Sequence, residues 1–178
     1  GLNLNTMNTT FLMLGLALHG GLYNYVEAVN NAIDAAAQIV LQFPFYGGIQ
    51  GIIVGTGLAT LIVNAAVDVS TASTFPFFAF GVSALLNTFI PSAGGQYITM
   101  APILHDAAAQ IGVADSVVVS AYTIGDVSTN MLQPFFALPI LGVAGLSVRD
   151  IWGYVLMSLI VFVLVGSIAT LAFPMLFG

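Results

Sequence analysis

The sequence has very little charge and no cysteine. Charged residues make up 4% of the 178 residues, Arg149 is the single basic one, and the formal net charge is -6. A soluble domain carries roughly a quarter of its residues as charges, so this chain lacks the polar shell that a water-exposed surface needs. Without Lys/Arg clusters, we expect no nucleic-acid partner. The lack of cysteine excludes disulfides, thiolate nucleophiles and Cys-ligated metal sites.

Apolar residues dominate what is present. They account for 59% of the chain, and the mean hydropathy is +1.06. This composition predicts that the bilayer acts as solvent for much of the surface. Because backbone groups in hydrocarbon must be hydrogen-bonded internally, we expect helices. The predicted fold class is an all-α integral membrane protein, multi-pass in the inner (cytoplasmic) membrane, with the lipid bilayer as a partner.

The first part of the chain contains three helical patterns. The apolar stretch 10–21 is too short to cross a bilayer, which needs ~20 helical residues, unless it includes Asn5 and Asn8 or stops part-way. Residues 23–42 alternate polar and apolar side chains at helical spacing, which predicts a helix at the membrane interface. Residues 43–67 are long enough to cross and rich in glycine, as close helix packing in lipid favours.

The second part contains two polar interruptions. Apolar runs 75–90 and 97–104 flank a polar segment at 91–96, and each run is too short to span, so we expect a re-entrant hairpin over 75–104. Segment 115–146 reads as one helix broken at 125–130, and 151–173 as an uninterrupted final span. The sequence therefore predicts one transmembrane domain over 1–178, a helix bundle with one re-entrant hairpin and one discontinuous helix.

Both interruptions predict a binding site. Broken helices persist at membrane depth only where they are buried in protein or line a watery cavity. In secondary transporters, half-helix N-termini face anionic substrate groups, and free carbonyls coordinate coupling cations. The predicted substrate- and ion-binding residues lie at or beside the two breaks: Asn87, Thr88, Ser92, Gly94, Gly95, Gln96, Asp126, Ser128, Thr129, Asn130 and Gln133.

Asp126 is the only acidic residue inside a predicted span. An ionisable group there is costly, which makes it a functional candidate, and we expect it to bind the coupling ion or proton. The structural alternative is that Asp126 or Ser128 caps the second half-helix. Both roles are compatible with one another.

The neutral polar candidates also have structural alternatives. Asn87 and Thr88 precede the hairpin tip by one turn, but such residues also hydrogen-bond between membrane helices. Gln96, Asn130 and Gln133 flank the breaks, and they either bond a carboxylate or ion or satisfy carbonyls freed by the neighbouring Pro91 and Pro134.

The histidines do not form a metal-binding pattern. His19 follows a short apolar run, which favours an interfacial position, and His105 beside Asp106 looks like a solvated hairpin exit. With no clustered acids, a zinc or iron site is not expected. No nucleophile–base pair is visible, so we expect no enzyme. No cofactor is predicted beyond Na⁺ as a possible coupling ion near Ser92 and Asp126.

Arg149 gives the only indication of orientation. By the positive-inside tendency it places the loop before the last helix in the cytoplasm. The hairpin mouth, with His105, Asp106 and Asp115, is then on the outer side.

Four segments in order resemble the C-terminal half of the short-chain fatty acid transporter family (AtoE type): QFPFYGGI at 42–49, NTFIPSAGGQ at 87–96, GDVSTNMLQPFFALP at 125–139 and RDIWGY at 149–154. That family looks like part of the wider ion transporter superfamily, whose members have two inverted repeats, each with a re-entrant hairpin and a broken helix. This chain would be one such repeat. The resemblance implies a hairpin tip at 92–96 and an unwound loop at 125–130.

The resemblance also implies a function. It indicates uptake of small monocarboxylates such as acetoacetate or butyrate, driven by protons or sodium. Dicarboxylate relatives have Ser-Asn-Thr at the hairpin tip, whereas this tip is Pro-Ser-Ala-Gly-Gly, so their sodium ligands do not transfer directly.

A whole family member is more than twice this length. The chain begins with Gly1 and has no basic region before its first apolar run, so we expect a fragment whose N-terminus lies upstream. The expected partners are the missing N-terminal repeat or a second copy in a homo-oligomer, and a small carboxylate substrate. A cation-coupled secondary carrier is the leading hypothesis; a channel and a structural membrane subunit of a larger complex are the alternatives.

Overall fold

The described part of the chain is helical throughout. The structure is a computed structural model that describes residues 3–133 and 137–177, and within these ranges it contains no strand. The helices are α1 (Leu4–Leu18), α2 (Leu22–Gly55), α3 (Leu58–Asp68), α4 (Phe75–Asn87), α5 (Ala93–Ile111), α6 (Asp115–Thr129), α7 (Leu138–Ala144) and α8 (Val148–Phe177). The all-α prediction is confirmed.

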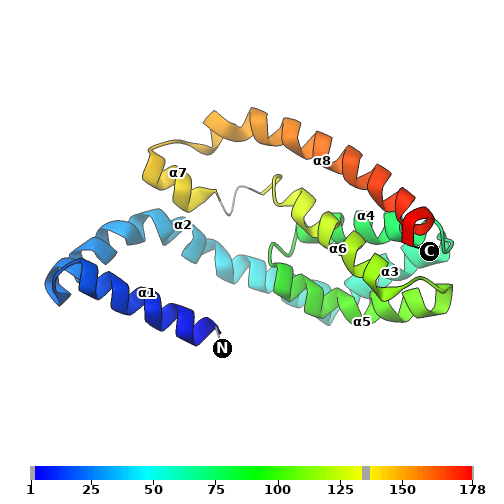
Figure 1. Cartoon of the computed structure of the whole chain (residues 1–178), viewed down its shortest axis with the longest axis horizontal. Helices are drawn as coiled ribbons and strands as arrows, with labels where there is room; N and C mark the ends of the chain where they lie inside the picture. The colour runs from blue at the N-terminus through cyan, green and yellow to red at the C-terminus, as the bar shows by residue number, and fades with distance from the viewer. Residues whose placement is uncertain (1–2, 134–136, 178) are drawn as a thin grey trace.

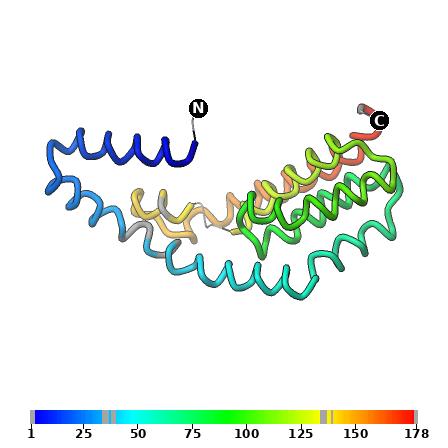
Figure 2. Tube along the Cα trace, turned by 90° about the horizontal axis from the view of Figure 1, so that it is seen from below, coloured from blue at the N-terminus to red at the C-terminus, as the bar shows by residue number. Residues whose placement is uncertain are grey.

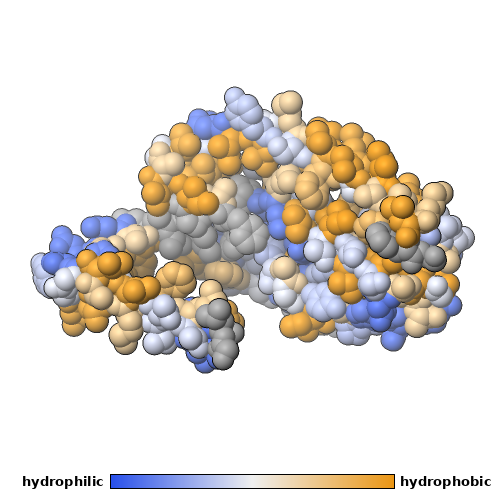
Figure 3. Space-filling view, viewed as in Figure 1, coloured by the Kyte–Doolittle hydropathy of each residue, from blue (hydrophilic) through white to orange (hydrophobic). Residues whose placement is uncertain are grey.

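Within residues 3–133 and 137–177, one helix is long and apolar enough to cross a membrane. This segment is Val148–Leu176, and a second candidate exists if Val40–Gly55 and Leu58–Asp68 form one bent span. Apolar residues cover much of the visible surface along α8 (Figure 3), where Met157, Val161 and Leu164 are exposed. A long helix that exposes such side chains fits a lipid-facing position.

Helix α1 and the first part of α2 form an arm that extends from the rest of the molecule (Figures 1 and 2). Helix α1 begins after Asn3, whose Oδ1 accepts a hydrogen bond from the Thr6 amide at 2.8 Å. This N-cap starts the helix early enough to include Asn5 and Asn8. Gly20 and Gly21, with φ of 69° and 156°, turn the chain into α2.

Helix α2 differs from the expected pair of separate helices. It runs without interruption through Pro44, and the break comes instead at Gly57, where α2 and α3 meet at 58°. Gly57 has a φ of 72°, a left-handed conformation that glycine adopts without steric cost. The expected span 43–67 is therefore bent near its C-terminal third. Of the expected polar stripe, the side chains at 34 and 38 lie outside the described residues.

Helices α4, α5 and α6 form the body of the molecule, and α8 packs along α4 and α6. The α4–α6 contact is very close, because a Cβ placed on Gly125 would lie 2.3 Å from the Phe80 carbonyl oxygen. Small residues allow backbones in a membrane to approach in this way. The largest buried apolar side chains of this core include Val63, Phe75, Leu86, Ile90, Met100 and Val118.

The hairpin of α4 and α5 has a longer second arm than expected. Helix α4 ends at Asn87, and α5 begins after its N-cap Ser92 and runs to Ile111, seven residues beyond the expected end at Leu104. Gly112, with a φ of 82°, ends α5. That the hairpin is re-entrant stays a prediction.

The expected break at 125–130 is wrong in position. Residues 125–129 belong to α6, which ends at Thr129, and the next helix is the short α7. In the sequence, Gly125 predicts a break in the helix. In the structure, its lack of a side chain instead allows the close contact with Phe80. The interruption therefore begins after Thr129. Residues 134–136, among them Pro134, which was expected to free a carbonyl, lie outside the described residues.

Helix α8 begins earlier than the expected position 151. The Asp150 Oδ2 accepts hydrogen bonds from the backbone amide and the hydroxyl of Ser147, both at 2.8 Å. This side chain satisfies an amide group at the helix start, so the helix includes Arg149.

Candidate functional site

The predicted residues of the hairpin and of α6 meet at the Asn87 side chain. Its Nδ2 donates to the Asp126 carbonyl oxygen at 2.7 Å, to Asn130 Oδ1 at 2.8 Å and to Thr129 Oγ1 at 3.0 Å. Thr129 in turn donates to the Ala84 carbonyl at 2.9 Å. Asn87, Asp126 and Thr129 are buried. One amide group thus holds the C-terminal end of α4 against the C-terminal end of α6.

A second layer of polar contacts lies one turn earlier on α4. Ser83 donates to the Tyr122 carbonyl at 2.8 Å, and Gln96 Nε2 donates to the Ser83 carbonyl at 2.7 Å. Gln96 is fully buried. It therefore satisfies a backbone carbonyl, as the structural alternative expected, although the carbonyl belongs to Ser83 rather than to the turn beside Pro91.

Thr88 and Gln133 are also brought together. Gln133 Nε2 donates to the Thr88 carbonyl oxygen. The hairpin tip is therefore tied to the chain beyond α6 as well as to α6 itself.

Four buried side-chain oxygens in this region have no hydrogen-bond partner among the described residues. They are Asn87 Oδ1, Gln96 Oε1, Asp126 Oδ1 and Gln133 Oε1. A buried acceptor without a donor costs about 1–3 kcal/mol, and a carboxylate costs more. All four are acceptors, which is the group type that a proton or a hard cation would satisfy.

The hairpin tip faces a different element. Ser92 Oγ accepts from the Gly95 amide at 3.3 Å, so this hydroxyl caps α5. The Gly95 carbonyl accepts from Gln50 Nε2 of α2 at 3.4 Å. Gly94 is exposed, with open space around it. Ser92, Gly94 and Gly95 thus lie apart from the Asn87 contacts.

A cavity of about 140 Å³ lies between α2 and the tip. It is lined by Phe43, Tyr46, Gly47, Gln50, Ile90, Pro91 and Ser92. The QFPFYGGI segment therefore packs beside the hairpin tip, a juxtaposition that the sequence order did not predict.

The structural alternative, in which Asp126 or Ser128 caps the second half-helix, is wrong. Helix α7 has Ala137 as its N-cap and no side-chain cap bond, and Asp126 lies inside α6. Ser128 Oγ donates to the Gly125 carbonyl of its own helix at 2.7 Å. Neither residue satisfies the start of the second half-helix.

A larger cavity of about 300 Å³ lies at the interruption after α6. Its lining combines two amide side chains with apolar side chains of α6, α8 and the segments next to α6 and α7: Asn130 and Gln133, with Val127, Met131, Ala137, Ile151, Trp152 and Val155. Ligand sites are typically apolar clefts of ~300–1,000 Å³ with a few polar groups. This cavity has the size and lining for a small amphiphilic molecule.

Gln50, Ser83 and Tyr122 also belong to this region, and the sequence analysis did not select them. Gln50 is an amide side chain between the glycines of the span 43–67, a signal that would have identified it. Ser83 and Tyr122 lie in apolar runs on different helices. They are 39 residues apart in sequence and are joined by a hydrogen bond between the helices. No local pattern indicates such a pairing.

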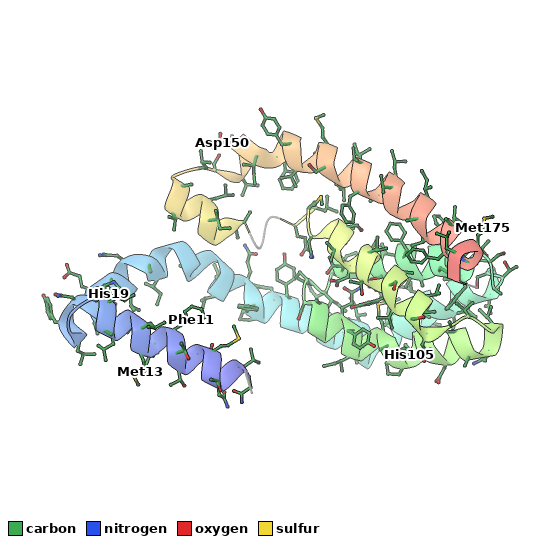
Figure 4. The ribbon with its side chains drawn as sticks, in the orientation of Figure 1. Phe11, Met13, His19, His105, Asp150 and Met175 are labelled. Carbon is green, nitrogen blue, oxygen red and sulfur yellow. The ribbon has the colours of Figure 1, made fainter. Side chains whose placement is uncertain are left out.

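The two histidines lie at opposite ends of the molecule (Figure 4). His19 is at the turn between α1 and α2, whereas His105 is on α5 in the body. Within residues 3–133 and 137–177, no group of three or more His, Cys, Asp or Glu residues is placed to hold a metal ion.

Replacing Asn87 with alanine is expected to destabilise the body by about 1–3 kcal/mol, because three acceptors lose their donor. The change would be measured as the unfolding midpoint of the complete protein in detergent. Asn64→Ala is the matched control, since Asn64 is exposed on α3. Equal midpoints for the two variants would show that the Asn87 contacts do not hold the helices together.

Comparison with known proteins shows the family of the chain. The model of the family described as "Short chain fatty acid transporter" matches residues 1–175. The chain belongs to the short-chain fatty acid transporter family. The resemblance seen in the four segments is thereby confirmed. The family is named as one of transporters and not of enzymes, as the sequence predicted.

Two relatives in the short-chain fatty acid transporter family carry the name "Putative short-chain fatty acid transporter". One is from Haemophilus influenzae (strain ATCC 51907 / DSM 11121 / KW20 / Rd) and one from Escherichia coli (strain K12), and each is 40% identical to this chain over 159 residues. The matched part is 89% of this chain and 36% of each relative, so the chain spans about a third of their length. No solved structure matches the chain.

Proposed function

We propose that the complete protein is a secondary carrier of short-chain monocarboxylates such as butyrate or acetoacetate, coupled to H⁺ or Na⁺ and located in the inner membrane. Membership of the short-chain fatty acid transporter family supports the proposal that short-chain fatty acids are the substrates. The observation that carries the proposal is the cavity of about 300 Å³ at the helix interruption, because its lining suits both ends of such a molecule.

The apolar walls would hold the short alkyl chain. Val127, Ile151 and Trp152 come from α6 and α8, and burying each CH₂ of a ligand against such side chains contributes ≈ 0.8 kcal/mol. A cavity near the lower limit of usual ligand sites favours a small molecule. Longer acids would need more room than these walls leave.

The amide side chains would hold the carboxylate. Asn130 Oδ1 accepts from Asn87, so its NH₂ group is the part that remains to donate, and it has no hydrogen bond in the described part of the chain. Asn130 lines the cavity beside Gln133. Hydrogen bonds to an ionised carboxylate are stronger than neutral ones, which supports this end as the polar end of the site.

The coupling cation would bind beside Asp126. Asp126 Oδ1 and Asn87 Oδ1 are buried acceptors without donors, and Gln96 Oε1 from α5 is a third. Na⁺ would be coordinated by oxygen atoms such as these from three helices. A coupling proton would instead bind to the Asp126 carboxylate. Ser92, expected to take part, is instead engaged with Gly95.

The remainder of the protein would supply the scaffold. We infer that a second repeat, or a second copy of this chain, packs against the body and that relative movement gives alternating access to the site. The chain's coverage of about a third of its relatives leaves room for such a repeat in the whole protein.

The test is uptake of labelled butyrate and acetoacetate into proteoliposomes containing the complete protein, under imposed H⁺ or Na⁺ gradients. Accumulation against the substrate gradient, dependent on one of the cations, is the expected result. Conduction without cation dependence would favour a channel instead. No movement of any short acid would favour a structural subunit.

Removing the Trp152 ring is expected to broaden substrate choice. Trp152→Ala enlarges the cavity, so uptake of hexanoate relative to butyrate should rise about tenfold. This is the scale of discrimination that one or two methylene groups give in an apolar pocket. Tyr154→Ala, which removes a 76% exposed ring from the same helix, is the control and should leave the ratio unchanged. An unchanged ratio in both variants would place the alkyl chain elsewhere.

A further inference from the structure

Four polar and aromatic side chains connect the end of the α5–α6 hairpin with the interior. His105 Nδ1 lies 2.9 Å from Asp115 Oδ1, and His105 Nε2 lies 3.4 Å from the Tyr97 hydroxyl. The Tyr97 and Tyr122 rings meet edge-on with centroids 5.3 Å apart. The sequence had suggested that His105 is a solvated exit residue, but it is the centre of this group.

The spacing of these residues places them along one line. On α5, Tyr97 and His105 are eight residues apart, and on α6, Asp115, Tyr122 and Asp126 are separated by seven and four. Residues at such spacing share one helix face. Residues four apart have Cβ atoms ≈ 5–6 Å from one another, and residues seven or eight apart lie about two turns along the same face. The line therefore continues from Tyr122 to Asp126, one turn further along α6.

The two ends of the line differ in exposure. The Asp115 side chain is 70% exposed and the His105 side chain 33%, and Tyr97 is 38% exposed, whereas Tyr122 is 5% and Asp126 4% exposed. One end of the line thus contacts water, and the other ends at the buried carboxylate. The turn between α5 and α6 lies at the same end of the molecule as the C-terminal end of α8 (Figure 1), which the Arg149 prediction places outside.

We propose that Asp115, His105, Tyr97 and Tyr122 form a proton-entry row that carries the coupling proton from the outer side to Asp126. This inference rests on the proposed carrier function, and it names the proton as the coupling ion. The imidazole of a histidine both accepts and donates protons at its two nitrogens, which suits His105 to collect a proton from water. No protein, ligand or metal contact is needed beyond these side chains and water.

The proton balance is simple. Water delivers a proton to neutral His105, and the Asp115 carboxylate stabilises the imidazolium that forms. The proton then leaves His105 by way of the Tyr97 hydroxyl and ends on the Asp126 carboxylate, which becomes neutral, while His105 returns to its neutral form. The Tyr122 hydroxyl donates to the Ala93 carbonyl at 3.2 Å. No described hydrogen bond joins the two tyrosine hydroxyls, or the Tyr122 hydroxyl to Asp126, so the proposed path includes water between the Tyr97 hydroxyl and the Asp126 carboxylate, beside the Tyr122 ring.

Few other titratable groups occur on the packed elements. Helix α4 has none, and α3 has only Asp68, at its last position. On α5 itself, the exposed Asp106 follows His105. The buried α4 side of the body therefore offers no competing route to Asp126, and α8 carries its ionisable residues, Arg149, Asp150 and Tyr154, near its start.

The test compares two transport modes of the complete protein in proteoliposomes. His105→Gln is expected to lower proton-driven butyrate uptake about tenfold. Loss of a group in direct acid–base contact with a substrate costs ~100-fold or more, and the effect here is smaller because water partly replaces the imidazole. Exchange of labelled for unlabelled butyrate at equal pH needs no net proton movement, so it should stay unchanged. His19→Gln at the far end of the molecule is the matched control (Figure 4).

A second variant separates the row from packing. Tyr97→Phe keeps the ring contact with Tyr122 and removes only the hydroxyl, so it should also slow driven uptake and spare exchange. Normal driven uptake in both variants would overturn the proton-entry row. Absence of butyrate exchange in the unaltered protein would overturn the carrier proposal itself, which keeps the two failures distinct. Loss of exchange along with driven uptake in both variants would also overturn the row, since these residues would then act in folding or substrate binding.

Discussion

Asp126→Asn is expected to abolish gradient-driven uptake of short-chain acids while leaving the protein folded. Asparagine has nearly the shape of the carboxylate but neither accepts a proton nor carries charge. The contact to Asn87 uses the Asp126 backbone carbonyl, so it survives the substitution. The expected loss is on the order of 100-fold or more, the scale for removing a positioned proton-transfer group.

The same variant should retain exchange of labelled for unlabelled butyrate, because asparagine imitates the neutral, loaded carboxyl. Both modes would be measured in proteoliposomes under imposed H⁺ and Na⁺ gradients. Asp68→Asn, at the exposed end of α3, removes one carboxylate without touching the body and serves as control. Undiminished driven uptake in Asp126→Asn would leave Asp126 with no role in coupling.

Gly125→Ala is expected to destabilise the protein by about 3 kcal/mol, the upper end of the usual range for overpacking a core. The new methyl carbon would lie 2.3 Å from the Phe80 carbonyl oxygen, 2.9 Å from the Ser83 Cβ and 3.1 Å from the Ala84 amide nitrogen. Two of these atoms are backbone, so α4 and α6 must separate. That separation would also weaken the Ser83 and Asn87 hydrogen bonds between the same helices.

Gly81→Ala is the matched control for this prediction. Gly81 lies on α4, one residue after Phe80, and nothing lies within 4 Å of a Cβ placed there. Alanine at an open helical position is intrinsically favoured over glycine by up to about 1 kcal/mol. Unfolding midpoints in detergent should therefore fall for position 125 and stay or rise for position 81. Equal midpoints would mean that the two helices are not in close contact.

Much of the fold was visible in the sequence because membrane helices leave a strong compositional signal. The hairpin of α4 and α5 was predicted from a proline and two glycines between apolar runs. The exact ends were less predictable. Helix α5 continues past His105 and Asp106 to Gly112, since charged residues do not end a helix but a left-handed glycine does.

The position of the second break illustrates an ambiguity of glycine. Gly125 followed by Asp126 reads as a local interruption, yet the same absence of a side chain permits the close contact with Phe80. Only the position of α4 shows which of these two roles Gly125 has. Gly57, in contrast, bends the chain through its own backbone conformation, and it lies in a stretch with so many glycines that none stood out.

The candidate site was predicted in part for a similar reason. Asp126, Asn87 and Asn130 were selected because polar residues are costly in apolar spans, and they do lie together. The position of Ser92 on the α2 side of the tip depends on the path of the chain, which the sequence does not show. The pairing of His105 with Asp115 arises from the turn that folds α6 back on α5.

Asn130 contacts both Asn87 and the larger cavity, and this double contact has a thermodynamic consequence. Its oxygen accepts from Asn87, which also holds Asp126, while the residue lines the larger cavity. An acid in the cavity and a cation beside Asp126 would thus be separated by a single side chain. Linkage requires that, if the bound acid raises the cation affinity by some factor, the bound cation raises the acid affinity by the same factor. The two titrations, each with and without the other ligand, must return one common number.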